Sequence, residues 1–503
     1  MATIINHSRG IPGSGKTDAF LRKAKQHISR GKLFLMALPT LDLIKEIQDR
    51  CQALDLPCRS INDKESDKKR VKSLQGVLER KEPLILTTHS ALQLVDDTYI
   101  EGYTVVIDEV PSALEMDSKT LTQQDMDVLL SHLDNKNGEL NILPEHIATV
   151  KALIKAYKQA AVNGQAGTTS SEFKHTIFDA LIEDGVVSWK ALPLKNAYSI
   201  TTIKAGPIFQ KLSKAKEVHL LAANIAGSIF EVISLAKGFK FARSHFEPSD
   251  FSYTGNITLL PLMDFTWSKG RALRTEDGEY CPDHMGIKEK QFIDQAIARA
   301  YEHNKKQRIL LFKNNWFNSN AVADYSEICI CPADTRGKNE YSEYTSAILV
   351  YSGKANPNHV PALKAFAERL GLSGRELVDA WHVSNKLERS AQDVTRTAVR
   401  RRNNKENIRL YVQDIEVCEY LIANGMANAR IDKSLMLEVP IKKSGAPQLS
   451  NFDWFIENSL KNSLKKKDIV QGLKRLGMAQ STAYQRINLI CRLLAENSEP
   501  AVA

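Results

Sequence analysis

The stretch Gly10-Ile11-Pro12-Gly13-Ser14-Gly15-Lys16-Thr17 decides the fold, because it matches the pattern GxxxxGK[ST] at every fixed position. Glycines let backbone N–H groups curl around a phosphate, and the start of the following helix adds a favourable dipole. We therefore expect the loop to bind the phosphates of ATP. Lys16 would reach the outer phosphates, and the Thr17 hydroxyl would ligate Mg²⁺. The expected nucleotide-binding residues of the loop are Gly10, Gly13, Ser14, Gly15, Lys16 and Thr17.

The residues around this loop alternate short apolar runs with amphipathic segments. Apolar runs occur at Thr3–Asn6, Leu33–Leu38, Leu84–Thr88 and Thr104–Ile107, with helical stretches such as 18–28 and 41–54 between them. This rhythm predicts a parallel sheet flanked by helices. A chance glycine turn is the alternative interpretation of the loop, and a strand before it with a helix after it argues against chance.

A second acidic site follows about 90 residues later. The run Thr104-Val-Val-Ile-Asp108-Glu109 reads as a buried strand that ends in two carboxylates. We expect Asp108 to hold Mg²⁺ together with Thr17, and Glu109 to polarise the attacking water. The alternative for Glu109 is an acid that stabilises the N-terminus of a helix.

A second alternating unit lies between residues 283 and 415, with strands expected near 308–312, 328–331, 346–351 and 408–412. The predicted fold class is α/β, with two tandem RecA-like parallel-sheet lobes at 1–260 and 283–415. Residues of about 112–216 show few strand signals and are predicted to form a helical insertion. Residues 416–503 are predicted to be a helical region that carries a helix-turn-helix at about 465–495.

The composition fits a globular protein of 503 residues with several domains. The net charge of +9 is uneven: residues 461–503 hold eight Lys/Arg against three Asp/Glu, and residues 386–409 hold the same numbers. Such basic patches favour polyanions, although a solvated face is the plainer explanation. We find no apolar run long enough to span a membrane, no signal sequence and no CxxC pair among seven cysteines. We therefore expect no membrane partner and a cytoplasmic location.

The predicted helix-turn-helix joins an amphipathic helix that ends near Gly477 to a second helix that Ser481 would cap. Polar and basic residues on the second helix suit the major groove of DNA. The alternative is a module that packs on the lobes or on a partner protein. The residues expected to face DNA are Ser481, Thr482, Tyr484, Gln485 and Arg486.

The order of motifs resembles that of superfamily 2 helicases, the DEAD/DEAH-like group, and its phage and plasmid members in particular. In the first lobe, Asp108-Glu109-Val110-Pro111 is similar to motif II, and Leu220–Asn224 stands, in degenerate form, where motif III couples hydrolysis to strand contacts. Leu38-Pro39-Thr40 is similar to motif Ia and Thr87–Leu92 to motif Ic, which implies nucleic-acid backbone contacts by Pro39, Thr40, Thr88 and His89.

Two stretches of the second lobe resemble later motifs of the same family. Asp334–Asn339 is similar to motif V, which implies contacts of Thr335 and Arg336 with nucleic acid and of Gly337 with the nucleotide. Gln392–Arg401 is similar to motif VI, which implies that Gln392 and Arg396 act on the γ-phosphate. A guanidinium can bind a phosphoryl group bidentately. Helical spacing favours Arg400 over Arg401 as the second arginine, since 396, 400 and 403–404 would share a face. A basic helix on the nucleic-acid backbone is the alternative.

This resemblance implies an ATP-dependent helicase or translocase with ATP and Mg²⁺ as cofactors. Its partner would be single-stranded or forked DNA, with RNA also possible, in replication or recombination. The alternative is an ATP-switched DNA-binding protein, such as a replication initiator or regulator, that does not translocate. The second lobe discriminates between them, because an initiator has no use for motifs V and VI.

Overall fold

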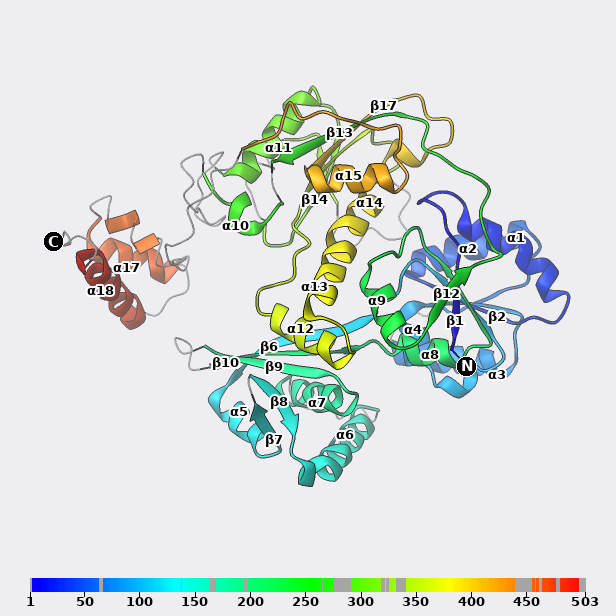
Figure 1. The fold of residues 1–503 in the computed structure, drawn as a ribbon, viewed down its shortest axis with the longest axis horizontal. Helices are drawn as coiled ribbons and strands as arrows, with labels where there is room; N and C mark the ends of the chain where they lie inside the picture. Colours follow the sequence, from blue (N-terminus) through cyan, green and yellow to red (C-terminus); the bar gives the residue numbers. More distant parts are fainter. Residues whose placement is uncertain are drawn as a thin grey trace.

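A computed structural model of the chain describes residues 2–62, 67–136, 138–162, 169–192, 197–264, 266–275, 291–317, 322, 325–331, 341–438, 455–456, 458–460, 464–475 and 480–496. Within these residues, two fully parallel sheets form the two lobes, and an antiparallel sheet lies beside the first lobe (Figure 1). Two tandem RecA-like α/β lobes are thus confirmed.

The first lobe is built on a seven-stranded sheet of the described chain, in the order β12-β1-β11-β5-β2-β4-β3. Its strands are β1 (Ile4–His7), β2 (Phe34–Leu38), β3 (Arg59–Ser60), β4 (Leu84–Thr88), β5 (Thr104–Asp108), β11 (Glu217–Leu221) and β12 (Lys240–Arg243). Its helices are α1 (Lys16–Ile28), α2 (Leu41–Ala53), α3 (Asp67–Glu79), α4 (His89–Leu94), α8 (Ile208–Lys214) and α9 (Ile229–Ala236), with a 3₁₀ turn at Asp97–Tyr99.

Alternation along β2 shows why this sheet is buried on both faces. Phe34 and Met36 pack with α1 and α2 in one core, whereas Leu35 and Ala37 pack on the opposite face with helices that include α3 and α8. Successive side chains of a strand point to opposite faces, so a continuous apolar run fills two cores at once. The carboxyl ends of β1 and β5 then lie at one edge, where loops can bind a ligand.

The prediction that residues of about 112–216 form a helical insertion is wrong. Residues 114–205 include a five-stranded antiparallel sheet, in the order β6-β10-β9-β8-β7 over the residues described. Its strands are β6 (Leu114–Thr122), β7 (Leu133–Lys136), β8 (Glu139–Ile142), β9 (Val186–Leu192) and β10 (Ala197–Ala205); its helices are α5 (Gln123–Leu130), α6 (Ile147–Val162) and α7 (Thr169–Ile182), with a 3₁₀ turn at Pro144–His146. One sheet face is solvated, so β6 carries many polar residues and lacks an apolar run.

The second lobe has a six-stranded parallel sheet, in the order β15-β14-β16-β17-β13-β18 among the described residues. Its strands are β13 (Asn256–Met263), β14 (Ile309–Lys313), β15 (Ile328–Ile330), β16 (Ser346–Val350), β17 (Asn407–Asp414) and β18 (Arg430–Ile431). β13 pairs with β17, so this sheet starts at Asn256, before the predicted boundaries of 260 and 283.

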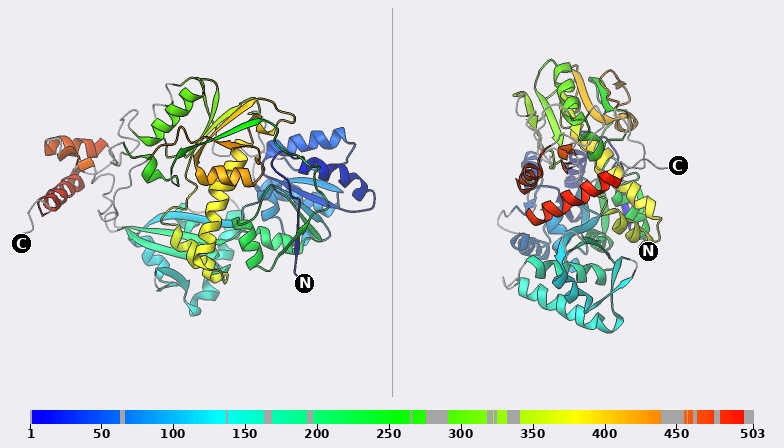
Figure 2. Two further views of the ribbon diagram at one scale, coloured as in Figure 1. Left: turned by 45° about the horizontal axis from the view of Figure 1, so that its top comes forward. Right: turned by 90° about the vertical axis from the view of Figure 1, so that its left-hand side faces the viewer.

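Helices of the second lobe cover both faces of its sheet and also reach the first lobe. They are α10 (Lys269–Ala272), α11 (Phe292–His303), α12 (Val360–Arg369), α13 (Gly374–His382), a π-helix (Val383–Glu388), α14 (Arg389–Val394), a 3₁₀ turn (Ala398–Arg400) and α15 (Ile415–Ala423). α12 packs beside β9 and β10, and α13 runs from there toward α14 (Figures 1 and 2). Leu363 and Phe366 of α12 belong to the core of the first lobe.

The tail contains α17 (Lys466–Arg475) and α18 (Gln480–Glu496), which pack around Ile469, Leu473 and Ile487 at one end of the molecule (Figure 2). The second helix starts at Gln480, so Ser481 lies inside it and does not precede it as predicted. The residues between the two helices, 476–479, lie outside those described. Among the helices described, none has the length and hydropathy needed to cross a membrane.

Candidate functional site

The phosphate loop joins β1 to α1 and needs its glycines for backbone geometry. Gly10, Gly13 and Gly15 have φ angles of 155°, 82° and 87°, a region that side chains with a Cβ rarely adopt. Gly13 also faces the second lobe, because a Cβ placed there would lie 3.3 Å from Cβ of Arg400. The buried hydroxyl of Ser14 has no hydrogen-bond partner within the described part of the chain. A cradle of this kind, with an unsatisfied hydroxyl, fits a phosphate group.

Lys16 lies inside this cradle. Its Nζ donates to the carbonyl oxygens of Gly10, at 2.7 Å, and of Ile11, at 3.2 Å. Burial lowers the pKa of Lys16 to about 8, against the opposing attraction of nearby carboxylates. The ammonium group is therefore poorly solvated, and its hydrogen bonds go to carbonyl oxygens, so an anion in the cradle would stabilise it.

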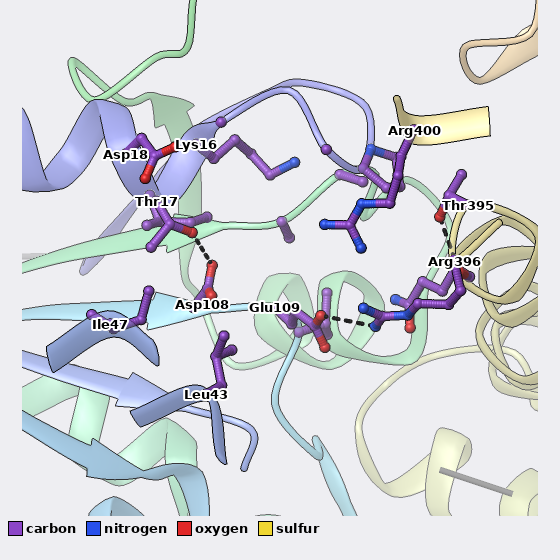
Figure 3. Close-up of a pocket in the computed structure, with 18 of the residues that line it drawn as sticks. Lys16, Thr17, Asp18, Leu43, Ile47, Asp108, Glu109, Thr395, Arg396 and Arg400 are labelled. Carbon is purple, nitrogen blue, oxygen red and sulfur yellow. Dashed lines mark hydrogen bonds and ion pairs between the residues drawn. The ribbon is translucent and has the colours of Figure 1, made fainter. Parts of the chain in front are cut away.

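Asp108 and Thr17 are the residues that could hold a cation. Thr17 Oγ1 donates a hydrogen bond of 3.0 Å to Oδ1 of Asp108, which ends β5 (Figure 3). Burial, followed by the charge of Glu109, raises the pKa of Asp108 to about 7. A hydroxyl and a carboxylate are ligands that Mg²⁺ prefers, and a divalent ion would favour the ionised carboxylate. The hydroxyl of Thr17 and the carboxylate of Asp108 therefore fit the Mg²⁺ ion that the sequence predicts.

Glu109 faces the other lobe across the pocket. Its φ of 65° is unusual for a residue other than glycine, and such strain concentrates at functional sites. Oε1 of Glu109 lies 3.5 Å from Nη2 of Arg396, as the dashed line in Figure 3 shows. Oε2 is buried without a hydrogen-bond partner among the described residues. The carboxylate thus has one oxygen free to accept a hydrogen bond from a bound molecule.

Three predicted residues of the second lobe, Gln392, Arg396 and Arg400, line this same pocket. Burial and the neighbouring charge of Arg396 lower the pKa of Arg400. Arg401 points elsewhere: it forms ion pairs with Glu343, at 2.6 Å, and Glu406, at 3.0 Å. The geometry therefore separates the two arginines that the sequence left as alternatives.

The prediction that Arg396 and Arg400 share one face of a helix is wrong, although Arg400 does lie in the pocket. α14 ends at Val394, and Ala398–Arg400 is a separate 3₁₀ turn, so Arg396 and Arg400 share no helical face. The hydroxyl of Thr397 caps this turn by accepting a hydrogen bond from the N–H of Val399. This local competition with helical hydrogen bonding ends the helix early.

Sequence reasoning missed Glu388 as a residue of the pocket and left the role of Asn224 open. Asn224 Nδ2 donates to the hydroxyl of Tyr420, at 2.9 Å, and to Oδ1 of Asn424, at 3.2 Å. The Tyr420 hydroxyl in turn donates to the carboxylate of Glu388, the last residue of the π-helix. Burial raises the pKa of Glu388 to about 7. These hydrogen bonds connect Asn224, from the stretch predicted to correspond to motif III, to the second lobe. The residues that Asn224 contacts in the second lobe carry no recognisable sequence pattern.

The residues predicted to contact nucleic acid in the first lobe have internal partners. Thr40 accepts from the N–H of Leu43 at the start of α2, and Thr88 accepts from the N–H of Ala91 at the start of α4. The buried ring of His89 lies 3.0 Å from the carbonyl oxygen of Asp108. Pro39 is half-buried beside Thr40. These hydroxyls cap helices, so contacts with a nucleic-acid backbone stay a prediction for this edge.

The remaining predicted residues are only partly described. Thr335, Arg336 and Gly337 lie outside the described residues, within 332–340. On α18, Tyr484 and Gln485 are exposed, whereas Thr482 and Arg486 are half-buried; Ser481 lies in the first turn. DNA recognition by this helix stays a prediction.

Comparison with known proteins gives the following matches. Residues 9–147 match the family model of the DEAD/DEAH box helicase. No curated protein matches the chain. Among solved structures, S. tokodaii Xpd4 is 12% identical with a TM-score of 0.45, covering 86% of this chain and 96% of that one.

Two further solved structures are similar. Mss116p, bound to ssRNA and AMP-PNP, is 9% identical with a TM-score of 0.31, covering 98% of this chain and 83% of that one. The yeast DEAD-box splicing factor Prp28 is 12% identical with a TM-score of 0.21, covering 86% of this chain and 78% of that one.

We predict that Asp108→Asn stabilises the nucleotide-free protein. The pKa of Asp108 in the folded state, about 7, exceeds the value of 3.8 for an unperturbed aspartate, so the folded state binds the proton more tightly. Wild-type stability therefore falls as pH rises from about 4 to about 7, and the neutral Asn escapes this loss. We expect a gain on the order of 1–4 kcal/mol at pH 8 that shrinks toward pH 5, measured by calorimetry.

Asp379→Asn is the matched control, because Asp379 is exposed and forms a surface pair with Arg375. This substitution should change stability by less than about 1 kcal/mol at either pH. A gain from Asp108→Asn that is equal at pH 5 and pH 8 would show that burial does not perturb this carboxyl.

Proposed function

We propose that the chain is an ATP-driven nucleic-acid motor, a helicase or translocase. The match of residues 9–147 to the family model of the DEAD/DEAH box helicase supports this proposal. The observation that carries the proposal is one pocket lined by Lys16, Asp108 and Glu109 of the first lobe and by Arg396 and Arg400 of the second. A nucleotide bound there would link two lobes, and the loss of its γ-phosphate would weaken that link.

The role of each residue follows from its chemistry. The phosphate loop and Lys16 would hold the β- and γ-phosphates, and Thr17 with Asp108 would hold Mg²⁺. Bound Mg²⁺–ATP supplies the phosphoanhydride bond whose hydrolysis releases energy. Glu109 would accept a proton from the attacking water, with Gln392 helping to orient it. Arg396 and Arg400 would stabilise the charge that develops on the phosphoryl group.

The proposed substrate is DNA, single-stranded or forked, in replication or recombination, with RNA as the second possibility. The basic tail, with five more Lys/Arg than Asp/Glu over residues 461–503, favours a polyanion. The competing proposal is that the chain is an ATP-switched protein, which binds DNA but does not translocate along it. It would bind ATP in the same pocket but would not turn it over faster on nucleic acid.

We predict that single-stranded nucleic acid raises the rate of ATP hydrolysis by about tenfold or more. A motor requires this increase, because movement of its lobes along nucleic acid is coupled to hydrolysis. The rate is measured with ssDNA, dsDNA and RNA, followed by unwinding of duplexes with 3′ or 5′ tails. Lys16→Ala should lower turnover by about 100-fold or more while the fold is retained. Equal rates with and without every nucleic acid would favour the switch protein over the motor.

We predict that Arg396 and Arg400, which line the pocket, contribute to turnover and that the adjacent Arg401 does not. Arg396→Ala and Arg400→Ala should each lower kcat by about 100-fold or more, because a phosphoryl charge loses a guanidinium partner. Arg401→Ala is the matched control: it removes only ion pairs with Glu343 and Glu406, and kcat should stay within about twofold. If Arg401→Ala proves as damaging as Arg400→Ala, the assignment of the second arginine is wrong.

We predict that α18 strengthens DNA binding without taking part in hydrolysis. The double substitution Tyr484→Ala/Gln485→Ala removes two exposed side chains and should weaken affinity for duplex DNA by about 10–100-fold, with the basal ATPase unchanged. Leu464→Ala, which removes an exposed apolar side chain just before α17, serves as the control. Unchanged affinity in the double variant, measured by fluorescence anisotropy, would reassign the tail to packing or partner binding.

A further inference from the structure

A cluster of two histidines and a glutamate lies in the first lobe, away from the nucleotide pocket. Glu217 and His219 are two residues apart on β11, so their side chains emerge on one face of the sheet. His245 follows the end of β12, on the other side of β1. One ligand atom from each of the three residues lies within 4.8 Å of the others. None of the three lines the pocket that contains Lys16.

The ring of His219 is oriented as in metal sites. Its side chain is fully buried, and Nδ1 lies 2.8 Å from Oγ of Ser244. Nε2 lies 3.0 Å from Oε1 of Glu217, the distance of an ion pair, although the alignment falls short of a well-directed hydrogen bond. Histidines that bind metals use one ring nitrogen for the ion and the other for a hydrogen bond that fixes the ring. A buried ring nitrogen and a carboxylate oxygen this close together, without good hydrogen-bond alignment, are suited to ligate one cation between them.

The two oxygens of Glu217 have different neighbours. Oε2 lies 3.5 Å from Nζ of Lys32, whereas Oε1 faces His219. Lys32 can therefore neutralise one oxygen while the other remains available as a ligand, in the way that outer partners hold ligating carboxylates. The side chain of His245 is exposed, so the cluster opens to solvent on this side and leaves room for a water ligand.

We propose that Glu217, His219 and His245 form a binding site for a transition-metal ion of the Zn²⁺ type. Two imidazoles and one carboxylate suit Zn²⁺, with water completing four-fold coordination, whereas Mg²⁺ and Ca²⁺ prefer oxygen ligands alone. The site is distinct from the pair Thr17 and Asp108, and it does not depend on the proposed motor function.

The position of the site indicates a structural role. β12 is the edge strand of the seven-stranded sheet and pairs only with β1 within the residues described. A metal ion bound by β11 and by His245, two residues after the end of β12, would connect the two neighbours of β1, the strand that leads into the phosphate loop. Binding to the folded state alone raises stability by mass action.

The full-length chain, freed of metal with a chelator, tests the site. It is titrated with Zn²⁺ in the presence of excess Mg²⁺, which occupies the carboxylate at the nucleotide pocket. We expect one Zn²⁺ per chain after gel filtration, measured by elemental analysis, and a higher Tm. His245→Ala should weaken Zn²⁺ binding by about 100-fold or more, since loss of a ligand costs at least as much as loss of an outer partner. His245 is exposed, so its loss should not prevent folding.

Two further variants sharpen the result. Glu217→Gln keeps the shape of the side chain but removes its charge, and it should also lose the ion. His359→Ala is the matched control, because it removes an imidazole that bonds to Ser118 at another place in the fold. The proposal is overturned if the wild-type protein does not retain Zn²⁺. It is also overturned if His245→Ala and Glu217→Gln retain Zn²⁺ as tightly as the wild type. Retention in those variants with loss in Asp108→Asn would place the ion at the nucleotide pocket instead.

Discussion

The ion pair between Glu109 and Arg396 connects the two lobes directly across the nucleotide pocket. It joins the end of β5 to the segment after α14, across a separation of 287 residues in the sequence. Both side chains are largely buried, and the pair forms only while the two lobes lie together. The cleft is also held by Tyr253, whose hydroxyl donates to the carbonyl of Pro12 in the phosphate loop.

Basic side chains from both lobes converge on the same pocket. Lys16, Arg396 and Arg400 converge on it, and burial raises the pKa values of both Asp108 and Glu388 to about 7. Two of the carboxyls are therefore partly protonated near neutral pH. A triphosphate bound between the lobes would contact all three of these basic groups. Its affinity is thus coupled to closure of the cleft, because the arginines contribute only when the second lobe lies over the loop.

A buried lysine explains how the second lobe presents Glu388 to this pocket. Lys386 is fully buried in the π-helix and donates to Asp414, at 2.7 and 3.0 Å, and to Glu416. Asp414 ends β17 and caps α15, which carries Tyr420. The π-helix is therefore fixed to the sheet at Lys386, and two residues later Glu388 accepts from Tyr420. Extra-wide turns of this kind are rare and occur mostly at functional sites. Asn224 of the first lobe joins the same network, so a change in the pocket can reach both lobes.

The sequence predicted those parts of the fold that local pattern determines. Lys16 and Asp108 were found because a strand, a glycine loop and a helix occur within a few residues of one another. β6 was missed because its pairing partner β10 lies about 80 residues away and one face of the strand is polar. β13 was missed because of Pro261, which usually argues against a central strand. β18 pairs with β13 only at Thr258 and Leu259, so no strand hydrogen bond is lost at Pro261 on that side. The cluster at His219 joins β11 to His245 in the loop after β12. Only the pairing of both strands with β1 brings them together, and two histidines 26 residues apart carry no local signal.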